Sequence, residues 1–283
     1  MRRAPSTYSV RPEPVQGLRF VFNGVMGKDG ASTDSARTVL IVACVLTLGA
    51  AQPAVPVQRV QIVRVYPHDR GAFTQGLLFR DGRLYESTGM EGRSSIREVR
   101  LADGRVVRQV DVPPPYFGEG LVDWGDKLVS LSWQHGRGFI WDRKTFRKLG
   151  EWRYPGEGWA LTQNGREIIM SDGTPQLRFL DPATLKERRR ITVTVNGQRL
   201  SRLNELEWVK GEVLANIWMT NRIARIDPAS GRVKGWIDLS AVTRRVPNRG
   251  YDDVANGIAW DAKGGRLFVT GKNWPSLFEV KVR

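Results

Sequence analysis

Five short segments of the sequence begin with a polar side chain that a small or apolar residue follows. They start at Gln75, Glu119, Glu157, Glu205 and Asn256. If these positions face one another, three carboxylates share one partly desolvated place, and at least one should have a raised pKa. Such a carboxyl group can act as a general acid and base near neutral pH. A ring of this kind could equally bind a cation or ordered water, and the spacing alone leaves both interpretations open.

Aromatic residues lie close to these polar positions. They are Phe73, Phe117, Trp133, Trp159 and Trp218. If they face the same place, they form an aromatic enclosure for a small or cationic group. Core packing is the alternative for the three tryptophans, and it is the role that we expect for Trp124, Trp208 and Trp260.

The composition excludes several other chemistries. The chain has one Cys and two His, so it can form no intramolecular disulfide and no site that needs three His or several Cys ligands. Gly-rich phosphate-binding motifs are absent from the sequence. The net charge is +15, but the basic residues are scattered, with clusters only at 188–190 and 244–245. We therefore predict no nucleic-acid partner.

The elements that must position the polar residues are short strands that recur five times. One strand begins at Leu84, Leu128, Ile168, Val213 and Leu267, at intervals of 40 to 54 residues. A second strand keeps step with it and begins at Ile96, Phe139, Leu177, Ile223 and Leu277. Repeats of this length with several strands each are typical of β-propeller blades.

The fifth copy is incomplete, because the chain ends at Arg283 where a fourth strand should begin. The segment 60–66, before the first copy, has the character of that missing strand. We therefore predict an all-β fold, a five-bladed β-propeller that is closed when the N-terminal strand pairs with the last blade.

The N-terminal residues are typical of an export signal. Arg37 precedes an apolar run at 38–48, and Gly49 and two alanines follow it. We predict cleavage after Ala51, a leader at 1–51 whose residues 1–25 could reflect a wrongly assigned start, and one catalytic domain at 52–283. The expected location is periplasmic or extracellular, without stable membrane association. Lipid attachment at Cys44 is the alternative.

Ten short motifs, in order along the chain, resemble the plant and bacterial (papaya-type) glutaminyl-peptide cyclotransferases. The motifs are Phe73–Leu77, Glu86–Gly89, Phe117–Gly120, Leu131–Gln134, Gly156–Trp159, Ser171–Thr174, Leu203–Glu207, Asn216–Trp218, Asn256–Gly257 and Thr270–Pro275. Ser132 and Ala160 depart from the family pattern by small changes. The resemblance implies an enzyme that converts an N-terminal glutamine of a peptide or protein to pyroglutamate and releases ammonia.

The resemblance also implies roles for individual residues. Glu119 would be the general acid and base, and Gln75 and Asn204 would hydrogen-bond the substrate amide. The residues that would enclose the glutaminyl side chain are Phe73, Phe117, Trp133, Trp159 and Trp218. Lys272 would polarise the amide or contact the peptide, with a solvated loop lysine as the alternative. Glu157 and Glu205 could tune Glu119 or bind a cation.

No cofactor is expected, although family members from plants can carry a structural calcium in the channel. We expect a monomer whose partners are peptides or proteins with N-terminal glutamine. Two other functions stay open. A propeller that only binds a peptide would tolerate Glu119→Gln, and a metal-dependent lactonase or hydrolase would need an axial metal and usually has six blades.

Overall fold

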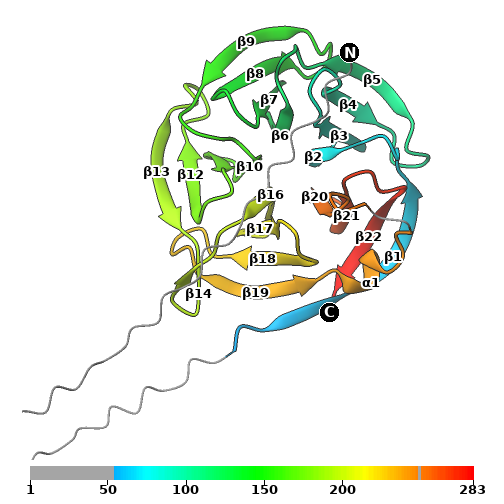
Figure 1. Ribbon diagram of the computed structural model, residues 1–283, viewed down its shortest axis with the longest axis vertical. Coiled ribbons are helices and arrows are strands. Elements are labelled where there is room, and N and C mark those ends of the chain that lie inside the picture. Colours follow the sequence, from blue (N-terminus) through cyan, green and yellow to red (C-terminus); the bar gives the residue numbers. More distant parts are fainter. Residues whose placement is uncertain (1–53, 248–249) are drawn as a thin grey trace, which may run out of the picture. The chain divides into compact units, whose positions relative to one another are not determined.

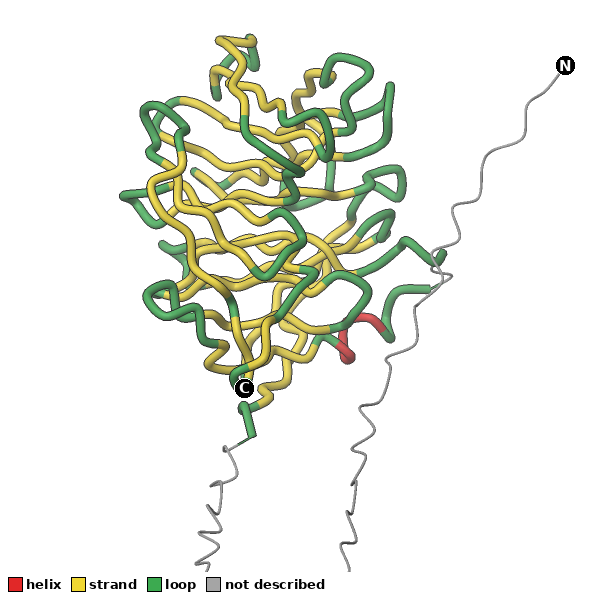
Figure 2. The backbone as a smooth tube through the Cα atoms, turned by 60° about the vertical axis from the view of Figure 1, so that its left-hand side comes forward, coloured by secondary structure: helices red, strands yellow, loops and turns green. Residues whose placement is uncertain are grey.

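Strands make up almost all of the regular structure. The computed structural model describes residues 54–247 and 250–283, and in these ranges twenty-two strands accompany one short helix, α1 (Ser240–Thr243). Figure 2 shows the strands in yellow and α1 as a red segment. The fold is therefore all-β, as predicted. The described part of the chain contains no helix with the length and apolar character that crossing a bilayer requires.

Three sheets of four antiparallel strands follow one another along the chain. The first consists of β2 (Thr74–Arg80), β3 (Arg83–Thr88), β4 (Ser95–Val99) and β5 (Val106–Asp111). The second consists of β6 (Gly118–Trp124), β7 (Lys127–Ser132), β8 (Arg137–Asp142) and β9 (Lys148–Arg153). The third consists of β10 (Ala160–Gln163), β11 (Ile168–Ser171), β12 (Gln176–Leu180) and β13 (Glu187–Thr192). Figure 1 shows their first strands nearest a common centre.

The remaining long strands form one eight-stranded sheet. One half is β16 (Leu203–Val209), β17 (Glu212–Ile217), β18 (Arg222–Ile226) and β19 (Val233–Asp238). The other half is β20 (Ala255–Asp261), β21 (Arg266–Gly271), β22 (Ser276–Val282) and β1 (Val57–Pro67). The short hairpin of β14 (Thr194–Val195) and β15 (Gln198–Arg199) lies outside this sheet.

Strand β1 joins the two halves of the eight-stranded sheet. Residues Val60–Pro67 pair antiparallel with β22, so the beginning and the end of the described chain lie side by side (Figure 1). This is the partner that the sequence predicted for the segment. Residues Val57–Arg59 pair in parallel with β19, which the sequence did not predict.

Local sequence explains the turns between strands. Asp81 and Gly82 connect β2 to β3, and Asn196 and Gly197 connect β14 to β15. All four residues have positive φ, between 50° and 79°, which the primed turns of tight hairpins require and which Asn, Asp and Gly tolerate best. The Asp-Gly and Asn-Gly pairs at these positions therefore form tight hairpin turns.

The apolar core is divided in the same way as the strands. The described residues form five clusters of buried apolar side chains. Each cluster contains one residue from the same place on a first strand, which is the strand that begins each group of four: β2, β6, β10, β16 or β20. These residues are Leu77, Leu121, Leu161, Leu206 and Ile258. The core therefore lies between neighbouring sheets, and it holds the starts of the first strands in a fixed arrangement. The leader predicted at 1–51 lies outside the described residues and stays a prediction.

Candidate active site

Four of the first strands begin with the same irregularity. The pairing register shifts at the start of β2, β6, β16 and β20, which is the mark of a β-bulge. The side chains at these bulges are Gln75, Glu119, Asn204 and Asn256. A bulge bends its strand and turns a side chain to a new direction, and all four side chains are buried. Equivalent bulges thus set one carboxyl group and three amides at corresponding places.

The predicted ring of five polar residues is wrong in the third repeat. Strand β10 pairs regularly with β11 from its first residue, Ala160. Trp159, the residue directly before β10, lies against the second sheet, because its carbonyl accepts the N–H of Gly120 at 3.0 Å. Glu157 lies two residues earlier. Its offset follows from the missing bulge, which the residue types do not reveal.

The predicted ring is also wrong in the fourth repeat. Asn204 lies at the bulge, and Glu205 is the residue after it. Both carboxylate oxygens of Glu205 accept backbone N–H groups, from Leu77 at 3.3 Å and Ile258 at 2.8 Å. Glu205 therefore joins two neighbouring sheets, and Glu119 is the carboxyl group among the four bulge residues.

A chain of amide hydrogen bonds leads to Glu119. The Asn256 side-chain N–H₂ donates to Gln75 Oε1 at 3.1 Å, and Gln75 Nε2 donates to Glu119 Oε1 at 3.1 Å. Burial raises the pKa of Glu119 well above its usual range, the charge of Lys272 opposes this rise, and the charge of Glu157 adds to it. A general acid and base needs a raised carboxyl pKa, so Glu119 is a candidate for that role.

Lys272 is buried, with 6% of its surface exposed, and so is not a solvated loop lysine. Its Nζ lies 4.6 Å from the centroid of the Phe73 ring, within the range of a cation–π interaction. Burial lowers the pKa of Lys272, and the charges of Glu119 and Asp252 oppose that change. The ammonium group and the Glu119 carboxyl group therefore act on each other in a poorly solvated place.

Three site residues occupy equivalent positions, directly after the second strand of their group of four (β7, β17 or β21). Trp133, Trp218 and Lys272 each follow a second strand, and each backbone N–H donates to the residue just before the paired first strand, at 2.9–3.0 Å. Gly89 makes the same bond in the first repeat. A Cβ at Gly89 would lie 2.3 Å from the Phe117 ring, so glycine leaves the room that this ring needs.

The predicted aromatic residues form two edge-to-face groups. Phe117 contacts Phe73 and Trp133 with ring centroids 6.1 and 5.9 Å apart, and Trp159 contacts Trp218 at 5.7 Å. These tryptophans lie outside the five core clusters of the described residues, whereas Trp124, Trp208 and Trp260 pack against those clusters, as predicted.

Glu157 connects the two aromatic groups. Its Oε2 accepts the indole N–H of Trp133 and that of Trp159, each at 2.9 Å. A charged acceptor strengthens both hydrogen bonds. The structure thus gives Glu157 a role in orienting two rings, which the sequence had left open.

Two buried amide oxygens of the site lack partners. Asn204 Oδ1 and Asn256 Oδ1 accept no hydrogen bond from any described residue. An unsatisfied buried acceptor is costly, and the N–H groups of a bound substrate can satisfy it. Asn256 was predicted as a member of the ring but not as a residue that binds substrate. Its Asn-Gly pair at the start of an inner strand was the available signal.

Comparisons with known proteins show the family of this chain. The model of the family described as glutamine cyclotransferase matches residues 36–282. The chain belongs to the glutamine cyclotransferase family. It is 41% identical over 231 residues to a glutaminyl-peptide cyclotransferase of Arabidopsis thaliana, which covers 80% of this chain and 72% of the plant protein. The crystal structure of Myxococcus xanthus glutaminyl cyclase matches with a TM-score of 0.76 and 38% identity, over 80% of this chain and 98% of the other.

Residues 54–247 and 250–283 of this glutamine cyclotransferase family member contain no group of three or more His, Cys, Asp or Glu side chains that could hold a metal ion. Glu205 already uses both oxygens on backbone N–H groups, so it is a poor ligand for the calcium that the family resemblance allows.

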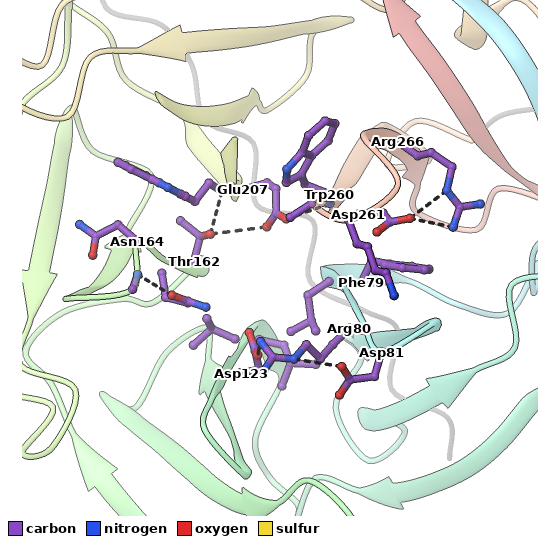
Figure 3. Close-up of a pocket in the computed structure, with 18 of the residues that line it drawn as sticks. Phe79, Arg80, Asp81, Asp123, Thr162, Asn164, Glu207, Trp260, Asp261 and Arg266 are labelled. Atoms are coloured by element: carbon purple, nitrogen blue, oxygen red, sulfur yellow. Dashed lines mark hydrogen bonds and ion pairs between the residues drawn. The ribbon is translucent and has the colours of Figure 1, made fainter. Parts of the chain in front are cut away.

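A large cavity lies at the other ends of the first strands (Figure 3). It has a volume of about 1230 Å³, and all five first strands contribute to its lining. Two of its carboxylates have arginine partners: Asp123 is 3.0 Å from Arg80, and Asp261 is 2.8 Å from Arg266. Glu207 accepts the backbone N–H of Trp260 at 2.9 Å, and burial still raises its pKa well above the usual range. The sequence did not predict this cavity, and none of the predicted catalytic or substrate-binding residues lines it.

Proposed function

We propose that the protein is a glutaminyl-peptide cyclotransferase that converts the N-terminal glutamine of peptides and proteins to pyroglutamate. Membership of the glutamine cyclotransferase family supports the activity. The observation that carries the mechanism is a buried Glu119, held by the Gln75 amide and acted on by the Lys272 charge. In chemical class the reaction is an acyl transfer, because the glutaminyl acyl group moves from ammonia to the α-amine.

In the first step the α-amine attacks the side-chain amide carbon of the same residue. A C–N bond forms and closes the five-membered lactam, and the ionised Glu119 takes the proton that the amine loses. The two reacting groups belong to one residue, so much of the proximity advantage, about 10⁵–10⁸ M in effective molarity, lies in the substrate. The enzyme must mainly supply proton transfer and charge stabilisation.

In the second step the tetrahedral intermediate collapses. Glu119 returns its proton to the amide nitrogen, the C–N bond to that nitrogen breaks, and ammonia leaves. The Lys272 ammonium stabilises the oxyanion that exists between the two steps. This assignment gives Lys272 the polarising role rather than a contact with the peptide.

The two amide side chains predicted to bind substrate differ in which hydrogen-bonding atoms are still available to a substrate. Gln75 uses its oxygen on Asn256 and its N–H₂ on Glu119, so we assign it to orienting Glu119. Asn204 Oδ1 accepts nothing from the described residues and is assigned to the substrate N–H groups. Phe73, Phe117 and the three tryptophans enclose the glutaminyl side chain and exclude water.

We further propose that the reaction needs no metal. A cation bound at Glu119 would be repelled by the neighbouring Lys272 ammonium, which supports this assignment. Activity that survives prolonged treatment with a chelator is the expected result, and activity restored only by added metal would contradict it.

The finer features of the fold belong to the same proposal. Five core clusters, with five first strands around one cavity, support five blades. The pairing of β1 with β22 supports closure of the ring at the last blade. We also propose that the chain acts as a monomer, and that it is exported after removal of the leader. Size-exclusion chromatography and N-terminal sequencing of the secreted protein test these points.

The deciding experiment is mass spectrometry of a peptide with N-terminal glutamine after incubation with the purified protein. Loss of one ammonia with the wild type, and none with Glu119→Gln, is the expected outcome. If the folded wild type leaves the peptide unchanged, the cyclase function is wrong and peptide binding without catalysis takes its place.

A further inference from the structure

A buried histidine outside the reacting site contacts two acceptors at once. His68 lies between β1 and β2, and its Nδ1 is 2.7 Å from the carbonyl oxygen of Trp274. Its Nε2 is 3.0 Å from Glu86 Oε1, and both side chains are at most 4% exposed. Because a neutral imidazole has one N–H, only the imidazolium can donate to both oxygens.

The surroundings of Glu86 favour the charged pair. Glu86 on β3 also accepts the hydroxyl of Thr74 at 2.6 Å. Burial would raise the pKa of Glu86, but the charge and hydrogen bond of His68 outweigh it, and the pKa is lowered. Burial would lower the pKa of His68, but Glu86 outweighs it, and the pKa is raised. Both directions correspond to an imidazolium beside a carboxylate.

Other groups near the pair complete its environment. Asp69, the next residue, raises the pKa of His68, and Arg97 on β4 lowers the pKa of Glu86. Arg97 and Asp69 form their own ion pair at 2.8 Å. The Thr270 hydroxyl on β21 lies 3.5 Å from His68 Nδ1. The pair is thus part of an alternating network of two cations and two anions.

The pair connects two elements that carry site residues. Trp274 belongs to the turn 272–275 after β21, which holds Lys272, and the His68 backbone N–H donates to the Pro275 carbonyl in that turn at 3.0 Å. On the other side Glu86 holds Thr74, the residue before Gln75. Lys272 and Gln75 both act directly on Glu119.

We propose that His68, as an imidazolium paired with Glu86, is a positioning residue that holds the Lys272 turn against the start of the Gln75 strand. The inference rests on the proposed cyclase function. When His68 loses its proton, Nε2 presents a lone pair to the Glu86 carboxylate, so the connection between the two elements weakens. The device acts on the geometry of Glu119 without touching the substrate.

The protonation state can be measured without activity. The full chain has two histidines, His68 and His135, so ¹⁵N ring spectra of the His135→Asn variant report on His68 alone. Both ring nitrogens should be protonated at pH 7. In Glu86→Gln the ring should be neutral, with Nδ1–H donating to Trp274 and Nε2 accepting from the new amide. A neutral His68 in the otherwise wild-type chain at pH 7 overturns the proposal.

Kinetics test the positioning role. His68→Gln should lower kcat about ten- to a hundredfold, as expected for a small misplacement of reacting groups, with KM changed less than about threefold. Wild-type kcat should fall as pH rises through the His68 ionisation seen by NMR. Glu86→Gln keeps the hydrogen bonds with a neutral ring, so it should retain kcat within about threefold and lack that decline.

Tyr66→Phe is the matched control. It removes the 2.8 Å hydrogen bond from Tyr66 to Glu279 between β1 and β22, two residues from His68, and should leave kcat and its pH profile unchanged. If Tyr66→Phe lowers kcat as much as His68→Gln does, His68 only helps to stabilise the packing around β1 and β22, and the proposal is overturned. An active wild type whose folded His68→Gln variant keeps full kcat overturns this inference alone, whereas an inactive wild type overturns the cyclase function as well.

Discussion

The two ends of the first strands differ in the partners of their carboxyl groups. At the ends that line the large cavity, Asp123 and Asp261 have arginine partners, and Glu207 accepts a backbone N–H although burial raises its pKa. At the other ends, Glu119 accepts one amide N–H, burial raises its pKa, and the charge of Lys272 opposes that rise. A raised pKa is therefore common to Glu119 and Glu207, and the buried lysine that acts on Glu119 distinguishes the proposed site.

The largest expected difference is between variants that replace one carboxyl group at each end of the first strands. Glu119→Gln removes the acid and base, and kcat should fall about 10²–10⁴-fold. Glu207→Gln removes a half-buried carboxyl group of the cavity, whose pKa burial also raises, and it should leave kcat within about twofold. Steady-state kinetics with a glutaminyl peptide measure both. Similar losses in the two variants would mean that the cavity end also takes part in catalysis.

Removal of the acceptor that orients the two indoles should act on binding. Glu157→Leu takes away both indole hydrogen bonds, each worth about 1 kcal/mol, so KM should rise about tenfold or more while kcat changes less. The same assays report this split. An unchanged KM would show that Trp133 and Trp159 hold their positions by packing alone.

The pH dependence of kcat/KM should distinguish the site groups Glu119 and Lys272 from the carboxylates that have arginine partners. Glu119 must be ionised to accept a proton, and its pKa is raised, so kcat/KM should increase as pH rises through that pKa. On the alkaline side activity should fall, in a step separate from the one expected for His68, as Lys272, whose pKa is lowered, loses its charge. Lys272→Arg should move the alkaline limb upward, because arginine stays protonated. If the alkaline fall of activity stays at the same pH in Lys272→Arg, the ionisation of Lys272 does not cause it.

Stability should show the cost of an uncompensated site. Because the folded-state pKa of Glu119 is raised, the folded protein holds this proton more tightly than the unfolded chain. Stability is therefore lost as pH rises from the unfolded pKa toward the folded one. Glu119→Gln should raise Tm at pH 8, by about 2–4 °C for each kcal/mol regained, with the difference disappearing near pH 4. Calorimetry at the two pH values decides; a lower Tm at pH 8 would contradict the assignment.

The smallest effect is expected at the rim of the cavity. Arg80→Gln breaks an ion pair whose arginine is 45% exposed, and such pairs contribute about 0.2–1 kcal/mol. Chemical unfolding should detect a small decrease in stability, with kcat unchanged. A large loss of activity here would connect the two ends of the strands.

Much of the site could be predicted because its residue types are distinctive in their repeats. Glu119 and the aromatic residues next to the strand starts follow from the recurring strands, Lys272 follows from the resemblance to the cyclotransferase family, and the structure brings them together. The places of Glu157 and Glu205 could not be predicted, because a one-residue bulge decides which side chain faces the site.

The sequence by itself determined the all-β class, the repeated strands and the strand that pairs with β22. These depend on local preferences and on spacing, which are properties of the chain alone. Only the tertiary structure decided that Glu205 joins two sheets, that Glu157 holds two indoles, and that His68 and Glu86 connect the turn of Lys272 to the strand of Gln75. Those contacts join residues far apart in the chain, and their partners are chosen by strand register and burial.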